Sequence, residues 1–234
     1  MGCGSSDAGS AGAPSAPPAQ KAKSSTGGGS KKTSMGGQIV MEYFNVGHGR
    51  GSSLEFCLAH AKVDWKKNPI TFEEWPAKKS SGKTGEFGAM PIVYHNGSKY
   101  DCSVPTLRRL CMQFGYYPSQ DWKKAAVCDM ISETFNDVLN LWSGAILSQK
   151  TDAEKADVFK NSMEPTGAAC KLFKIVEAQL NKNGGRFILG NQISMCDFAM
   201  CGLTFDYILN DQSPMTGLLK PIVMQNHPRL ATYA

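Results

Sequence analysis

The chain lacks several features that would define its class at once. No apolar run in its 234 residues approaches the roughly 18 that a bilayer-spanning helix needs. Its eight cysteines contain no C-x-x-C pair, and no histidine spacing of the zinc-binding kind accompanies them. We therefore expect no metal site. The sequence also shows no secretory-leader pattern, so we expect free thiols in a reducing compartment.

A concentrated basic surface is also missing. The net charge is +5, and more than half of it lies in residues 1–36, where four lysines accompany one aspartate. The remainder is nearly neutral and mixed in sign. Because a nucleic-acid surface shows a basic stripe on the folded domain, we expect no nucleic-acid partner.

Residues 1–36 differ from the rest in composition, with abundant Gly, Ser, Ala and Pro and almost no large apolar side chain. Such a segment buries too little surface to offset its ordering entropy, so we expect a disordered linker. Its first six residues, MGCGSS, fit the acylation pattern. Gly2 would carry myristate and Cys3 palmitate, and two chains anchor durably where one does not. The prediction is a cytoplasmic protein tethered to a membrane surface.

Residues 37–116 alternate between strand and helix patterns. An Asn96-Gly97 turn joins the last two strands, and Ser103 is expected to cap the helix that follows. The order β-α-β, connection, β-β-α predicts a thioredoxin-like domain with a mixed four-stranded sheet flanked by helices. The expected strands are Gln38–Phe44, Asn68–Phe72, Pro91–His95 and Ser98–Tyr100, with a helix over Leu54–Ala61 and a loop over Pro76–Gly88.

Residues 119–234 show no strand pattern, so we expect an all-helical domain there. Apolar periodicity predicts helices over 122–148, over 153–180 with a break at Pro165-Thr166-Gly167, and over 193–210. Ser194 and Asp197 form a capping-box pattern at the start of the last helix. The fold class is thus α/β followed by all-α.

Several segments resemble the tyrosine-type cytosolic glutathione transferases, most closely the sigma class that includes the haematopoietic prostaglandin D synthases. They cover residues from 39 to the end of the chain. The matching segments are Ile39–Asn45 with His48-Gly49-Arg50, Glu74-Trp75-Pro76 with Lys79, Phe87–Ile92, Arg186–Phe198 and Asn226–Leu230.

The resemblance implies an enzyme that conjugates glutathione to hydrophobic electrophiles. A free thiol is mostly protonated at neutral pH, so a hydroxyl donor aimed at the sulfur must stabilise the thiolate. The resemblance gives that role to Tyr43, with Arg50 in support and Phe44 beside the hydrophobic substrate. It assigns glutathione contacts to Trp75, Lys79, Met90, a cis Pro91, Cys102, Ser103 and, across a homodimer, Asp137.

Two departures keep other functions open. Cys102 stands where the family usually has Gln, which removes an amide donor and acceptor, and the helical domain is shorter than usual. A catalytically weak or inactive binding or scaffold protein is the alternative, and a prostaglandin-type isomerase is a variant. A thiol-disulfide enzyme ranks last, because no cysteine lies near positions 47–51.

Overall fold

A four-stranded mixed sheet in the order β2-β1-β3-β4 forms the first half of the fold. β1 (Ile39–Phe44) pairs in parallel with β2 (Trp65–Ile70) and antiparallel with β3 (Ile92–His95), which pairs antiparallel with β4 (Ser98–Asp101). The computed structural model describes residues 37–46 and 49–233. The predicted acylated tail, with Gly2 and Cys3, lies outside the described residues, as does His48.

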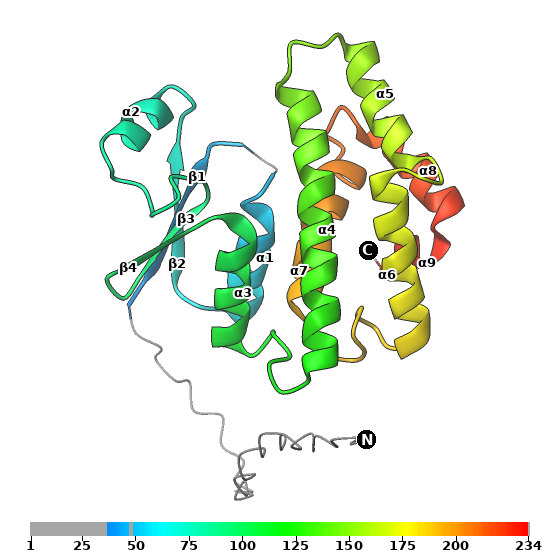
Figure 1. Cartoon of the computed structure of the whole chain (residues 1–234), viewed down its shortest axis with the longest axis horizontal. Coiled ribbons are helices and arrows are strands. Elements are labelled where there is room, and N and C mark those ends of the chain that lie inside the picture. The colour runs from blue at the N-terminus through cyan, green and yellow to red at the C-terminus, as the bar shows by residue number, and fades with distance from the viewer. Residues whose placement is uncertain (1–36, 47–48, 234) are drawn as a thin grey trace, which may run out of the picture. The chain divides into compact units, whose positions relative to one another are not determined.

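Helices accompany this sheet, and the sequence predicts the first and the last of them (Figure 1). α1 (Ser52–Ala61) follows β1, α2 (Glu74–Ser80) follows β2, and α3 (Ser103–Phe114) follows β4. Side chains alternate along β1, so Met41 and Tyr43 are buried while Phe44 is half-buried. The predicted thioredoxin-like arrangement is confirmed.

The second half is helical throughout, apart from one isolated bridge between Phe187 and Gly190. α7 packs against both α1 and α4, which joins the two halves. Gly202 of α7 illustrates how close this contact is, because a Cβ there would lie 2.7 Å from Ser53 Oγ of α1. The elements are α4 (Trp122–Leu147), α5 (Asp152–Met163), α6 (Ala168–Asn183), α7 (Met195–Leu203), the π-helix η1 (Thr204–Ile208), α8 (Thr216–Asn226) and α9 (Pro228–Tyr233).

The predicted capping box is present at the start of α7. The buried Asp197 carboxylate accepts from the Ser194 N–H at 2.8 Å, and it also accepts from the Ile188 N–H and the Tyr233 hydroxyl. These bonds compensate a carboxylate whose pKa burial raises. Asp197 thus ties α7, the preceding loop and α9 together, which is a structural role.

Three local predictions were wrong. The second strand runs over Trp65–Ile70 instead of Asn68–Phe72, because it is an edge strand whose polar residues are exposed and so hide its pattern. Part of the predicted loop is α2, where Thr71 and Glu74 exchange hydrogen bonds of the capping-box kind. The third correction concerns the start of α3, where Cys102 is the N-cap and Ser103 the first helical residue.

Candidate active site

A cleft of about 320 Å³ lies between the sheet domain and α4. Its walls come from the end of β1, the turn before α1, the α2 region, the loop before β3, α4 and η1. Five residues predicted from the sequence meet there. They are Tyr43, Phe44, Arg50, Trp75 and Met90.

The Tyr43 hydroxyl is hydrogen-bonded to the turn that leads into α1. The Arg50 N–H donates to Tyr43 Oη at 2.8 Å. Two glycines make this approach possible, since a Cβ at Gly49 would lie 2.6 Å from Tyr43 Oη and one at Gly51 2.6 Å from Tyr43 Cδ1. Because Oη accepts a bond from the backbone, its own proton remains available for a partner in the cleft.

The environment keeps the Tyr43 phenol protonated. Burial raises its pKa above the ordinary value, although the N–H groups of Arg50 and Gly51 and the Arg50 charge act in the opposite direction. A protonated phenol that already accepts a hydrogen bond is a stronger donor than an isolated one. The group is therefore suited to donate to an anion, and less suited to act as a phenolate base.

Arg50 reaches from this turn to the helical domain. Its Nη1 donates to Asn136 Oδ1 at 2.6 Å, and its Nη2 donates to Asn140 Oδ1. These asparagines lie four residues apart on α4 and therefore on one face of the helix. Both partners are neutral, so the Arg50 charge is not cancelled by a carboxylate and is felt at Tyr43.

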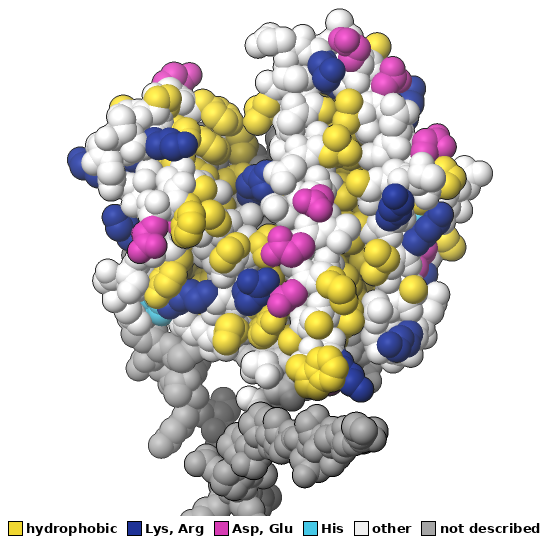
Figure 2. Space-filling view, viewed as in Figure 1, with side chains coloured by type: hydrophobic (Ala, Val, Ile, Leu, Met, Phe, Trp, Pro, Cys, Tyr) yellow, Lys and Arg dark blue, Asp and Glu magenta, His cyan; other side chains and the backbone are white. Residues whose placement is uncertain are grey.

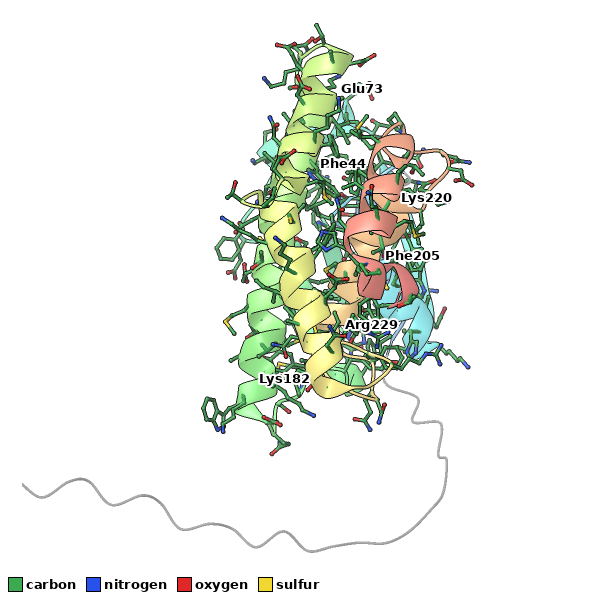
Figure 3. All side chains as sticks on the ribbon, turned by 90° about the vertical axis from the view of Figure 1, so that its right-hand side faces the viewer. Phe44, Glu73, Lys182, Phe205, Lys220 and Arg229 are labelled. Carbon is green, nitrogen blue, oxygen red and sulfur yellow. The ribbon has the colours of Figure 1, made fainter. Side chains whose placement is uncertain are left out.

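Aromatic side chains form one wall of the cleft. Phe44, labelled in Figure 3, stacks on Phe72 with ring centroids 4.4 Å apart and meets Trp75 edge-on at 5.9 Å. Phe72 keeps 51% of its surface exposed. Leu139, Ile146 and Leu147 of α4 face this wall across the cleft. An apolar, partly open space of this kind suits a hydrophobic ligand.

The Met90-Pro91 peptide is cis, as the resemblance implied, and Met90 lines the cleft. The loop before it is fixed by Asp101, whose Oδ2 accepts from the N–H groups of Phe87 at 2.9 Å and Ala89 at 3.3 Å. Lys79 lies next to this loop, since a Cβ at Gly88 would be 3.3 Å from its Cε.

Five predicted residues are not among the cleft's lining, namely Lys79, Pro91, Cys102, Ser103 and Asp137. Cys102 and Ser103 lie at the start of α3, and Cys102 has a positive φ of 68° with ψ 136°, which residues other than glycine rarely adopt. Burial and the Asp101 charge raise the pKa of the Cys102 thiol, which the Arg50 charge opposes. Asp137 is exposed on α4. Cys57 is buried in the middle of α1, not at its start.

Sequence reasoning missed the contributions of α4 and η1. Asn136, Asn140 and Tyr207 were not singled out, and Tyr207 lines the cleft while packing against Trp142. The local signal was weak: Asn140 interrupts the apolar run Val138-Leu139-Leu141-Trp142, whereas Asn136 and Tyr207 each stand next to an aspartate. Among the described residues, no group of three or more His, Cys, Asp or Glu side chains could hold a metal ion.

Comparison with known proteins identifies the family to which the chain belongs. A glutathione S-transferase from Anopheles gambiae is 30% identical over 192 residues, which cover 80% of this chain and 84% of the relative. The chain belongs to the glutathione S-transferase family. It is a sigma-like member of the cytosolic group, as the sequence predicts.

Other comparisons agree. Residues 136–234 match the family "Glutathione S-transferase, C-terminal domain". Glutathione S-transferase 2 of Manduca sexta is 27% identical over 206 residues, covering 84% of this chain and 95% of the relative. The prostaglandin synthase D structure from Nilaparvata lugens superimposes with a TM-score of 0.65 at 20% identity, over 84% of this chain and 90% of that one, which shows the shared fold.

Within the described part of the chain, no helix has both the length and the apolarity needed to cross a bilayer.

Proposed function

We propose that this glutathione transferase binds glutathione beside Tyr43 and transfers its thiolate to a hydrophobic electrophile in the cleft. The observation that carries the proposal is the Tyr43 hydroxyl, which accepts from the Arg50 N–H and borders an apolar cleft. A donor aimed at a sulfur lowers the free energy of the anion, by the logic of an oxyanion hole. The thiol proton leaves to solvent, and the sulfur attacks the electrophilic carbon as S⁻, forming a C–S bond while the bond broken at that carbon gives its electron pair to the displaced group.

The glutathione contacts extend this proposal along the sheet domain. Met90 would pair with the cysteinyl unit. Lys79 would hold the glycine carboxylate, with Trp75 packing beside it, and the N-terminus of α3 at Ser103 would hold the γ-glutamyl carboxylate. Free N–H groups and the positive end of a helix favour such an anion. Lys79 and Trp75 are carried by α2, and Met90 follows the loop whose backbone Asp101 binds.

The experiment is an ultraviolet titration of bound glutathione, which reports the thiolate. In the wild type the sulfur pKa should fall below its ordinary value of about 8.5. In Tyr43→Phe it should return toward that value, and kcat should drop on the order of 10²-fold. Tyr94→Phe is the matched control, because that hydroxyl donates to Glu42 on the sheet. An unshifted sulfur pKa in the wild type would favour the binding-protein alternative.

The second substrate is proposed to lie against Phe44 and the α4 residues opposite. The partly open aromatic wall favours an apolar electrophile over a charged one. The prostaglandin-type isomerase variant stays a prediction, and turnover of an endoperoxide without net consumption of glutathione would distinguish it.

A homodimer is proposed through the face of α3 and α4. Figure 2 shows hydrophobic and charged side chains intermingled there, and Met112, Trp122 and Met130 are all more than half exposed. Asp137 lies on α4 and would reach the glutamyl ammonium bound by the second subunit. Sedimentation should give a dimer mass, and Asp137→Asn should raise KM for glutathione.

The lipid anchor at Gly2 and Cys3 is a further proposal, supported by the sequence pattern alone. It would keep the enzyme at the cytoplasmic face of a membrane, where apolar electrophiles concentrate. Gly2→Ala should move the protein from membrane to soluble fractions, whereas Ser5→Ala should not. No shift in Gly2→Ala would remove the anchor.

A further inference from the structure

A buried carboxylate of the helical domain holds the turn behind Tyr43. Asp206 lies in η1 with only 4% of its surface exposed. Its Oδ2 accepts from the Gly49 N–H at 2.7 Å, although the two residues are 157 positions apart in the chain. The Ser52 hydroxyl is a second hydrogen-bond partner. Asp206 thus accepts from two donors of the turn that leads into α1.

The backbone of Gly49 and Arg50 connects Asp206 to the Tyr43 phenol. Gly49 precedes Arg50, whose N–H donates to Tyr43 Oη at 2.8 Å. Gly49 also lies so close that a Cβ there would be 2.6 Å from Oη. The turn and the phenol therefore cannot shift independently, and a displaced turn would redirect the hydroxyl.

The π-helix explains how η1 presents two consecutive buried polar residues. The Leu209 N–H donates to the Thr204 carbonyl at 2.8 Å, five residues back, which widens the turn. Asp206 then faces the α1 turn while Tyr207 packs against Trp142 and lines the cleft. Phe205, labelled in Figure 3, fixes η1 to α1 by packing on Phe56 at 5.5 Å.

We propose that Asp206 is a positioning residue for the thiolate site. By accepting from Gly49, it fixes the turn so that Arg50 holds Tyr43 Oη with its proton directed into the cleft. It touches neither substrate and acts only through the turn. The inference rests on the proposed role of Tyr43, and it assigns a distant acid of the helical domain to the geometry of the sulfur site.

The test compares two substitutions of the same side chain. Asp206→Asn keeps an acceptor oxygen for the Gly49 N–H and loses the charge, whereas Asp206→Ala loses both. Asp211→Asn, an exposed acid five residues further along, is the control. The readouts are the sulfur pKa of bound glutathione, kcat, and KM for glutathione. Near-ultraviolet circular dichroism at the assay temperature shows which variants are folded.

We expect Asp206→Ala to raise the sulfur pKa and to lower kcat on the order of 10–100-fold, because small misplacements at a reacting centre have effects of this size. KM for glutathione should change less than about threefold, since the tripeptide's own contacts remain. Asp206→Asn should retain most of the wild-type sulfur pKa and kcat. Should the alanine variant not fold, Asp206→Ser replaces it, because its shorter hydroxyl stops short of Gly49.

Two results would overturn the proposal. The first is a folded Asp206→Ala enzyme with an unchanged sulfur pKa and kcat. The second is an asparagine variant as impaired as the alanine one, because the charge and not the acceptor would then matter. Tyr43→Phe is measured in parallel. If that variant also leaves the sulfur pKa unchanged, the proposed function fails; if it raises it while Asp206→Ala does not, only the positioning role fails.

Discussion

Arg50 Nη1 donates to Asn136 Oδ1 across the boundary between the sheet domain and α4, at 2.6 Å. The guanidinium is thereby held beside the cleft by a neutral partner, which fixes its position without cancelling its charge. A positive charge held in this way can stabilise an anion near Tyr43. A carboxylate partner in place of Asn136 would cancel that charge.

Asn136→Ala should therefore loosen Arg50 and weaken the thiolate. We expect the sulfur pKa of bound glutathione to rise by less than in Tyr43→Phe. The reduction in kcat should be about 3–10-fold, which is less than the full loss of one hydrogen bond to a charged group (about 1.5–3 kcal/mol) would cause, because Asn140 still holds Arg50. Asn161→Ala, at an exposed position of α5, is the control. The measurement is the same absorbance titration, and an unchanged pKa would contradict the role given to Arg50.

How much of this site the sequence could predict depends on the origin of each contact. Tyr43, Arg50 and Met90 were identified because they lie at strand ends and turns that form a recognisable series along the chain. Asn136 and Asp206 were not, because each meets the α1 turn from a helix far away in the sequence. Apolar periodicity predicts which face of a helix is buried, and says nothing about which polar side chain bridges to another domain.

The secondary structure, like the site, could be predicted from the sequence only in part. The 26-residue α4 follows the predicted limits closely, because a long amphipathic pattern with the Asp121 cap is hard to mistake. β2 and α2 were misplaced, since an exposed edge strand has little apolar signal and Pro76 in the first turn of a helix resembles a loop. α8 and α9 were not predicted as helices at all.

Ser103 offers a prediction on substrate affinity. If the start of α3 binds the γ-glutamyl carboxylate, Ser103→Ala removes a hydroxyl donor to a charged group. We expect KM for glutathione to rise about tenfold with little change in the sulfur pKa, because Tyr43 is untouched. Ser119→Ala, on an exposed loop, should behave as wild type. Steady-state kinetics with glutathione varied tests this, and an unaltered KM would move the carboxylate site elsewhere.

Phe72 tests the hydrophobic side of the cleft. Its ring stacks on Phe44 and is half exposed, so Phe72→Ala removes part of the apolar wall without opening the core. We expect KM for an aromatic electrophile to rise about 5–30-fold, corresponding to roughly 1–2 kcal/mol of lost burial. KM for glutathione should stay the same. Phe187→Ala, outside the cleft, is the matched control.

The buried carboxyl group of Asp206 should make the free energy of unfolding depend on pH. Burial raises the pKa of its carboxyl to about 7; Glu55 of α1 adds to the rise, while Gly49, Ser52 and Lys67 of β2 oppose it. Tyr43 and Tyr207 are the titratable phenols that its charge affects.

Because the folded pKa exceeds the unfolded value of about 3.9, the folded state binds more protons between these values, and this group's contribution to stability falls as pH rises from about 4 to 7. Asp206→Asn does not titrate. Its free energy of unfolding should therefore gain on the wild type by about 1–4 kcal/mol between pH 4 and pH 7.5, at about 1.4 kcal/mol per unit of pKa shift.

Urea unfolding at the two pH values measures this difference, with Asp211→Asn as the control that should follow the wild type. A constant difference between Asp206→Asn and the wild type would show that the carboxylate is ionised throughout. In that case the hydrogen bonds that the α1 turn donates to Asp206, including the one from Gly49, would stabilise the ionised carboxylate by more than burial destabilises it.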